Sequence, residues 1–149
     1  QLDHGPIVAQ EKISIDLDDN TATLTTKLTR LAIQLLDNKL PEICAKTYTY
    51  TAQDENLVTF TPSHRSLTRE SAFIPWEKLR YSMNEKGAET HALIRSLNPE
   101  PGAWTTIKDK DLKILKSSLV ENKLKIEQVQ MSGKNPISWK QFCSGYLNE

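Results

Sequence analysis

Two ionisable side chains stand next to each other near the start of the chain, where Asp3 and His4 precede Gly5. A carboxylate beside an imidazole can orient the ring and hold a proton or a water molecule, as general acid–base catalysis requires. An aspartate before a glycine is, however, more often part of a turn. These residues alone leave both interpretations open, a turn and a catalytic group.

The other reactive side chains lack the spacing of a catalytic or metal site. Cys44 and Cys143 lie far apart in the sequence, so we expect two reduced thiols in a cytosolic protein, without a disulfide or a metal. His64 and His91 have no partner motif, and we expect both to be exposed to solvent.

Charge is unevenly distributed along a chain whose net charge is zero. Residues 1–63 hold five Lys or Arg against nine Asp or Glu, which gives −4, whereas residues 64–149 hold fourteen against ten, which gives +4. A polyanion is therefore expected to meet the second part. No apolar segment is long enough to cross a bilayer, and the start does not resemble a signal peptide.

The basic residues of the second part are candidates for phosphate contacts, which require only positive charge. A solvated surface is the plainer interpretation of any single one. Trp76, Trp104 and Trp139 could stack on bases, although their positions at the starts of elements favour packing in a core. The basic candidates are Arg65, Arg69, Lys78, Arg80, Arg95, Lys108, Lys110, Lys113, Lys116, Lys123 and Lys125.

The first third of the chain predicts a strand and then a helix. Apolar residues at every second position predict an edge strand over residues 7–15. Residues 16–20 are helix-capping residues, and Leu24, Leu28, Leu31 and Leu35 form the stripe of an amphipathic helix. We expect this helix to end by Pro41, with one further short turn through Cys44.

The rest of the chain predicts a linker and a small barrel. The apolar residues of residues 46–75 follow neither the helix period nor the strand period, which indicates a linker on the surface. A brief extended pairing is expected at residues 59–61. A helix is expected over residues 76–97, with Gly87 arguing against an unbroken one. Short strands are expected at residues 103–107, 112–115 and 124–129. Ser138 and Gln141 have the spacing of a capping box for a last helix to about Cys143.

Several segments resemble the methionyl-tRNA formyltransferase family, in order and over nearly the whole chain. The most specific is Ile94-Arg95-Ser96-Leu97-Asn98-Pro99-Glu100-Pro101-Gly102-Ala103-Trp104-Thr105. The others are Leu2-Asp3-His4-Gly5-Pro6-Ile7, Gln53-Asp54-Glu55, Leu57-Val58-Thr59-Phe60, Leu67-Thr68-Arg69-Glu70, Ile74-Pro75-Trp76, Val129-Gln130, Gly133-Lys134 and Gly145-Tyr146.

The resemblance implies an enzyme that transfers a formyl group from 10-formyltetrahydrofolate to the amino group of methionyl initiator tRNA. It implies Asp3 as a catalytic residue, with Leu2, Asp3 and Gly5 beside the folate and no metal. It implies tRNA contacts by Arg65, Arg69, Arg95, Lys108, Lys113 and Lys125. A cytoplasmic monomer that acts in translation initiation is expected.

The implied fold has three parts. Residues 1–46 would be the end of the formyltransferase catalytic domain, an α/β remnant with the last strand and helix of a Rossmann-like domain. Residues 47–75 would be a linker, and residues 76–149 a tRNA-binding domain, a leading helix followed by an OB-like β-barrel. Residues 115–124 are shorter than in most relatives, so we expect a reduced barrel that lacks a hairpin. Glu100 and His4 also depart from the family pattern.

The chain lacks an initial Met and opens on a turn-rich segment, so we expect a piece of a longer protein. The Asn and His that the family combines with Asp3 would lie upstream, and the chain alone is expected to be inactive. Two alternatives remain: a non-catalytic RNA-binding module, and a formyltransferase that acts on another amine acceptor.

Overall fold

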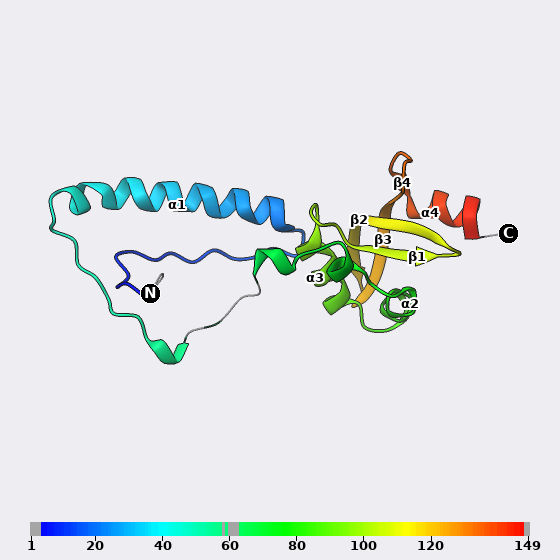
Figure 1. The fold of residues 1–149 in the computed structure, drawn as a ribbon, viewed down its shortest axis with the longest axis horizontal. Helices are drawn as coiled ribbons and strands as arrows, with labels where there is room; N and C mark the ends of the chain where they lie inside the picture. The colour runs from blue at the N-terminus through cyan, green and yellow to red at the C-terminus, as the bar shows by residue number, and fades with distance from the viewer. Residues whose placement is uncertain (1–3, 58, 60–62, 148–149) are drawn as a thin grey trace. The chain divides into compact units, whose positions relative to one another are not determined.

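The computed structural model describes residues 4–57, 59 and 63–147. Within them the chain forms two compact units, which we treat separately (Figure 1). Unit 1 comprises residues 1–16 and 23–62, and unit 2 comprises residues 17–22 and 63–149. No helix of the described residues is long and apolar enough to cross a membrane.

Helix α1 (Thr21–Cys44) dominates unit 1 and confirms the helix that the leucine stripe predicts. Leu24, Leu31 and Leu35 are half-buried, but Leu28 is 46% exposed and α1 has no buried residue. The predicted end of the helix at Pro41 is wrong, because Pro41 lies inside α1 and the further turn through Cys44 continues the same helix. The helix therefore presents an amphipathic face that the described residues leave largely uncovered.

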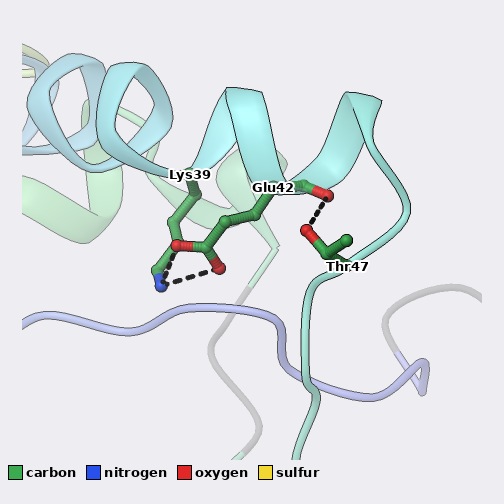
Figure 2. A network of polar contacts seen from close by, with 3 residues as sticks. All are labelled: Lys39, Glu42 and Thr47. Atoms are coloured by element: carbon green, nitrogen blue, oxygen red, sulfur yellow. Dashed lines mark hydrogen bonds and ion pairs between the residues drawn. The ribbon is translucent and has the colours of Figure 1, made fainter.

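Lys39, Glu42 and Thr47 form a network of polar contacts at the C-terminal end of α1 (Figure 2). The Lys39 ammonium donates to both carboxylate oxygens of Glu42, at 3.0 and 3.1 Å. The backbone carbonyl of Glu42 accepts from the Thr47 backbone N–H at 2.9 Å and from its hydroxyl at 3.4 Å. The last carbonyls of a helix have no partner within it, and the two bonds from Thr47 satisfy one of them.

The strand expected at residues 7–15 is wrong for this chain. Ile7 forms an isolated antiparallel bridge with Thr51, and no strand covers residues 8–15. Ile15 is 65% exposed. An alternating segment becomes a strand only when a neighbouring strand accepts its hydrogen bonds, and the described part of unit 1 offers just the bridge at Thr51. The pairing expected at residues 59–61 falls mostly outside the described residues.

After residues 17–22, unit 2 continues with two short 3-10 turns, His64–Ser66 and Glu70–Ala72, and then two helices, α2 (Trp76–Asn84) and α3 (Ala88–Leu97). The break between them falls at Gly87, as predicted. A Cβ at Gly87 would lie 2.2 Å from the backbone nitrogen of Leu124, so only glycine allows this close approach. Its N–H donates to the Asn122 carbonyl at 2.7 Å.

The helices are followed by a four-stranded antiparallel sheet in the order β1-β2-β3-β4 (Figure 1). Its strands are β1 (Trp104–Ile107), β2 (Lys110–Val120), β3 (Lys123–Met131) and β4 (Ile137–Ser138). The three predicted strands are confirmed in position, but β2 extends well past the predicted residue 115. Pairing of Ser117 to Val120 with β3 extends it, although the polar residues there show little apolar alternation.

Two tight hairpins set the register of the sheet. Lys108 and Asp109 connect β1 to β2, and Glu121 and Asn122 connect β2 to β3, all with positive φ. Two consecutive residues with positive φ are typical of the hairpin turn whose twist matches that of the flanking strands. The predicted short strands therefore belong to two continuous hairpins.

The core of unit 2 lies between the helices and the sheet. It includes Ile74, Leu79, Ile94, Leu112, Ile114, Val129 and Phe142, each no more than 1% exposed. Helix α4 (Trp139–Phe142) completes it, and a turn of π-helix continues over Cys143–Leu147. The predicted capping box is confirmed: the Ser138 hydroxyl accepts from the Gln141 N–H at 3.2 Å, and the Gln141 side chain accepts from the Ser138 N–H at 2.9 Å.

Candidate functional site

Residues from separate parts of the chain surround one hollow of unit 2, which we call the Trp104 hollow. Trp104 pairs with Lys113 on β2, and Lys113 pairs with Gln130 on β3, so the three residues form one row across the sheet. The hollow is lined by Arg69, Glu100, Pro101, Gly102, Trp104, Asp111, Lys113, Gln130, Met131, Ser132 and Gly133.

Arg69 is held in place at the edge of this hollow. Its guanidinium donates to the Asp111 carboxylate at 2.6 Å and lies 4.4 Å from the centre of the Trp104 ring. The Trp104 indole N–H in turn donates to the Arg69 carbonyl at 2.7 Å. Arg69 is exposed and Asp111 is half-buried, so this ion pair contributes little stability, but it fixes a planar cation on an aromatic face.

Gly102 permits the close packing of Lys113 in the hollow. Gly102 has a φ of +87°, and a Cβ there would lie 1.9 Å from Cε of Lys113. Its N–H donates to the Leu97 carbonyl at 2.8 Å. The positive φ favours glycine at this position, and the absence of a Cβ leaves room for the half-buried lysine stem, whose flexible end could otherwise move aside.

The three C-terminal segments that resemble the family, at Gln130, Lys134 and Tyr146, contact one another beside the hollow. The Gln130 side chain donates to the Lys134 carbonyl at 2.9 Å, across the turn that contains Gly133. The Lys134 ammonium lies 3.1 Å from the Tyr146 hydroxyl and 5.3 Å from the centre of its ring. Sequence reasoning did not select Asp111, Lys134 or Tyr146 as site residues. The Arg69–Asp111 and Lys134–Tyr146 contacts join residues 42 and 12 positions apart, so no local spacing could have indicated them.

Arg95 and Asn98 attach residues 17–22 and the sheet to the end of α3. The Arg95 guanidinium donates to the Asp19 carbonyl, and the Asn98 carbonyl accepts from the Thr21 N–H at 3.2 Å. The Asn98 amide donates to the carbonyls of Ile114 and Leu115 at 3.0 and 3.3 Å. The most specific resembling segment therefore includes side chains that stabilise the fold.

His91 is buried, so the expectation that it is exposed is wrong. It is 3% exposed, with Nδ1 at 2.9 Å from the Ser117 hydroxyl and Nε2 at 3.3 Å from the Leu17 carbonyl. Burial lowers the pKa of His91, and the nearby Arg95 acts in the same direction against the Leu17 carbonyl, Asp18 and Glu127. His91 lies on the face of α3 that packs against the sheet, and the sequence did not indicate this because His91 has no partner motif. The side chain of His64 lies outside the described residues.

The six predicted tRNA contacts do not form a single cluster. Arg69 and Lys113 share the Trp104 hollow, whereas Lys125 lines a different hollow. Arg95 is half-buried beside Asp18 and Asn20. Arg65 is exposed on a 3-10 turn, and Lys108 is exposed on the first hairpin, 3.5 Å from the Leu147 carbonyl.

The predicted folate-side residues fall in unit 1. Asp3 and Leu2 lie outside the described residues. Gly5 is exposed, its carbonyl accepts from the Gln53 side chain at 2.6 Å, and a Cβ there would meet nothing within 4 Å. Two resembling segments, those of Gly5 and Gln53, are therefore bonded to each other.

The described residues contain no group of three or more His, Cys, Asp or Glu that could hold a metal. Cys44 is an exposed free thiol. Cys143 is also free, and burial raises the pKa of its thiol. A higher pKa leaves less thiolate, the reactive form, so the environment of Cys143 does not favour a nucleophile.

Comparison with known proteins defines the class first. Residues 67–125, which span the 3-10 turn Glu70–Ala72, α2, α3, β1, β2 and the start of β3, match the family described as formyl transferase, C-terminal domain. Unit 2 thus carries a formyltransferase C-terminal domain.

Curated relatives specify the family. The chain is 37% identical over 123 residues to methionyl-tRNA formyltransferase of Listeria innocua, which covers 83% of the chain and 36% of that relative. It is 34% identical over 172 residues to the Dictyoglomus turgidum enzyme of that name, which covers 97% of the chain and 52% of the relative. Together with the domain match, these relatives support a C-terminal portion of a methionyl-tRNA formyltransferase, and the chain spans about a third to a half of their length.

Proposed function

We propose that the protein containing this chain transfers a formyl group from 10-formyltetrahydrofolate to the amino group of methionyl initiator tRNA, and that unit 2 holds the tRNA. One observation supports the second part most directly. Arg69, Trp104 and Gln130 come from three segments that resemble the family, and they surround one hollow together with the cation Lys113. The names of the relatives support formyl transfer.

The proposed chemistry begins with attack of the methionyl amine on the formyl carbon. A tetrahedral intermediate with a developing oxyanion forms, the amine loses a proton, and the folate nitrogen gains one as it leaves. We assign Asp3 to the orientation of a histidine and a proton in this step, with an Asn and a His from outside this chain. Leu2 and Gly5 would lie beside the folate, and the open space around Gly5 is compatible with a flat ring.

The proposed domain division keeps residues 1–46 as the end of a Rossmann-like catalytic domain, residues 47–75 as a linker and residues 76–149 as the tRNA-binding domain. The four-stranded meander supports a shortened OB-like barrel, because Glu121 and Asn122 close the β2–β3 hairpin with a two-residue turn. The alignment with the Dictyoglomus relative occupies 172 positions against 149 residues in the chain, as expected if that relative carries additional segments. We propose a cytoplasmic monomer.

Replacement of Asp3 tests the catalytic part of this proposal. In the full-length protein, Asp3→Asn is expected to abolish formylation, because an amide cannot take up a proton or hold the imidazole in the same way. The affinity for initiator tRNA is expected to stay within about twofold of wild type. Single-turnover formylation and filter binding measure the two quantities.

Glu11→Gln is the matched control, since Glu11 is an exposed carboxylate of the same segment. It is expected to retain wild-type turnover. Normal turnover in Asp3→Asn would remove Asp3 from the mechanism, and a large loss of tRNA affinity would show that its role is not purely chemical. A wild-type full-length protein that binds tRNA without formylating it would favour a non-catalytic RNA-binding module.

A further inference from the structure

A second hollow of unit 2, the tryptophan groove, has walls from three elements. Helix α2 contributes Trp76 and Met83, the β2–β3 hairpin contributes Val120, and the C-terminal helical segment contributes Trp139 and Leu147. Val120 is 52% exposed, and the other four residues are half-buried. The groove therefore offers apolar and aromatic surface to a ligand.

The aromatic rings of the groove are held by packing. The Trp76 and Trp139 rings are tilted with centroids 6.0 Å apart, and Trp139 stacks on Phe142 at 5.5 Å. Phe142 is 1% exposed and stacks in turn on Tyr146 at 5.4 Å. A ligand that binds Trp139 thus meets a ring whose orientation the core already sets, which reduces the entropy cost of binding.

Positive charge surrounds these rings. Arg80, Lys123, Lys125 and Lys140 line the groove, and none of them forms an ion pair within the part of the chain that the structure describes. Of the two acidic residues there, Glu127 accepts from the Ser118 hydroxyl at 2.8 Å and pairs with Lys116 at 3.1 Å. Among the described residues that line the groove, four cations consequently face one carboxylate without an ion pair, that of Glu121.

We propose that the tryptophan groove binds a single-stranded segment of RNA, with one base stacked against Trp139 and Trp76 and its phosphates on the four cations. Proteins that bind single strands combine a positive groove with aromatic side chains that stack on bases. A duplex would offer only phosphates, because its bases are already stacked on one another and its major groove is too narrow to enter. The inference rests on the proposed tRNA binding and specifies which part of the RNA the groove takes.

A second copy of the chain is a poorer occupant. In a symmetric dimer the same patch of both copies faces itself, so the four cations of each rim would meet those of the other. Such like-charge contacts oppose association. The phosphates of a nucleic acid complement the rim instead.

Binding of labelled oligonucleotides to the full-length protein tests the proposal. An unpaired heptanucleotide is expected to bind with at least tenfold higher affinity than a blunt duplex of equal charge, measured by fluorescence anisotropy at one salt concentration. Trp139→Leu is expected to weaken single-strand binding by roughly 5- to 100-fold, the loss of one stacked base, while Trp139→Tyr restores most of it. Thermal melting identifies any variant that does not fold.

Lys12→Gln is the control for Arg80→Gln, because both residues are exposed and only Arg80 lines the groove. Arg80→Gln is expected to weaken single-strand binding severalfold, and Lys12→Gln to leave it unchanged. Equal effects of the pair, or a folded Trp139→Leu protein that binds like wild type, would overturn the inference.

Two further outcomes separate this inference from the proposed function. Binding of initiator tRNA without binding of the single strand would overturn the groove proposal alone. Binding of neither RNA would overturn both. A concentration-dependent dimer that Val120→Glu abolishes would instead assign the groove to a second copy of the chain.

Discussion

At the scale of single residues, the burial of His91 links α3 to the sheet and to residues 17–22. The ring lies between the Ser117 hydroxyl and the Leu17 carbonyl, and both contacts depend on which ring nitrogen carries the proton. Burial lowers the pKa of His91, which means that the folded state favours the neutral ring. The charged groups around it are Arg95, Asp18 and Glu127.

The lowered pKa of His91 predicts a pH dependence of stability. The unfolded histidine has a pKa of about 6.5, so the unfolded state binds the proton first as the pH falls. The contribution of His91 to the free energy of unfolding is therefore complete above about pH 6.5 and is lost as the pH falls through the folded pKa. Urea unfolding between pH 5 and 8 measures this slope.

His91→Gln should remove that component of the slope, while His4→Gln, at an exposed position, should leave it in place. An unchanged slope in a folded His91→Gln protein would show that another group causes the pH dependence. The lost contacts to Ser117 and Leu17 would lower stability at every pH. The test therefore compares the pH dependence of the unfolding free energy in the two variants, and not its absolute value.

At the scale of elements, the joint between α2 and α3 depends on the tip of the second hairpin. Gly87 is close to Leu124 and donates to the Asn122 carbonyl, so the turn between the helices lies against the turn between the strands. Helix and hairpin therefore constrain each other. The helices, the hairpin and the sheet support both hollows of unit 2.

Gly87→Ala is expected to destabilise the protein by about 1–3 kcal/mol, because the new methyl group would overlap the β3 backbone, which cannot move aside as a flexible side chain can. The φ of Gly87 is −98°, so strain in the backbone angle does not add to this cost. The midpoint of urea unfolding measures the change.

Gly145→Ala is the control for that substitution, since a Cβ at Gly145 would meet nothing within 4 Å. It is expected to change stability by no more than about 0.5 kcal/mol. Equal losses at the two glycines would mean that the contact with Leu124 does not limit position 87.

At the scale of the whole molecule, the acidic first part and the basic second part favour the second as the surface for the proposed RNA. The positive side chains that line the two hollows include Arg69 and Lys113 in one and Arg80, Lys123, Lys125 and Lys140 in the other. Phosphate contacts of this kind release counterions and make binding depend on salt.

The affinity for initiator tRNA is therefore expected to fall linearly in a plot of log K against log salt. Lys113→Gln and Lys125→Gln should each reduce the slope by about 1, the contribution of one phosphate contact. Lys12→Gln, an exposed lysine of the acidic part, should not change it. Filter binding of the full-length protein across a salt series provides the measurement. A slope that neither variant changes would remove both lysines from the tRNA surface.

Much of the local structure could be predicted. The leucine stripe of α1 and the capping box of Ser138 and Gln141 depend on residues within a few helical turns of one another. The strand expected at residues 7–15 failed because pairing requires a neighbouring strand, which alternation cannot supply. The predicted β2 was too short because β3 pairs with the polar end of β2, and this end shows little apolar alternation.

The sequence by itself determined the family, the main helices and the basic second part, because these follow from local periodicity, motifs and composition. Only the tertiary structure decided which residues meet. It placed Arg69 on Trp104, aligned Lys113 with Gln130, buried His91 and surrounded the tryptophan groove with cations. Strand register and burial depend on contacts between groups that are distant along the chain. The free energy of such a contact depends on both partners and on closing the loop between them, so no single residue predicts it.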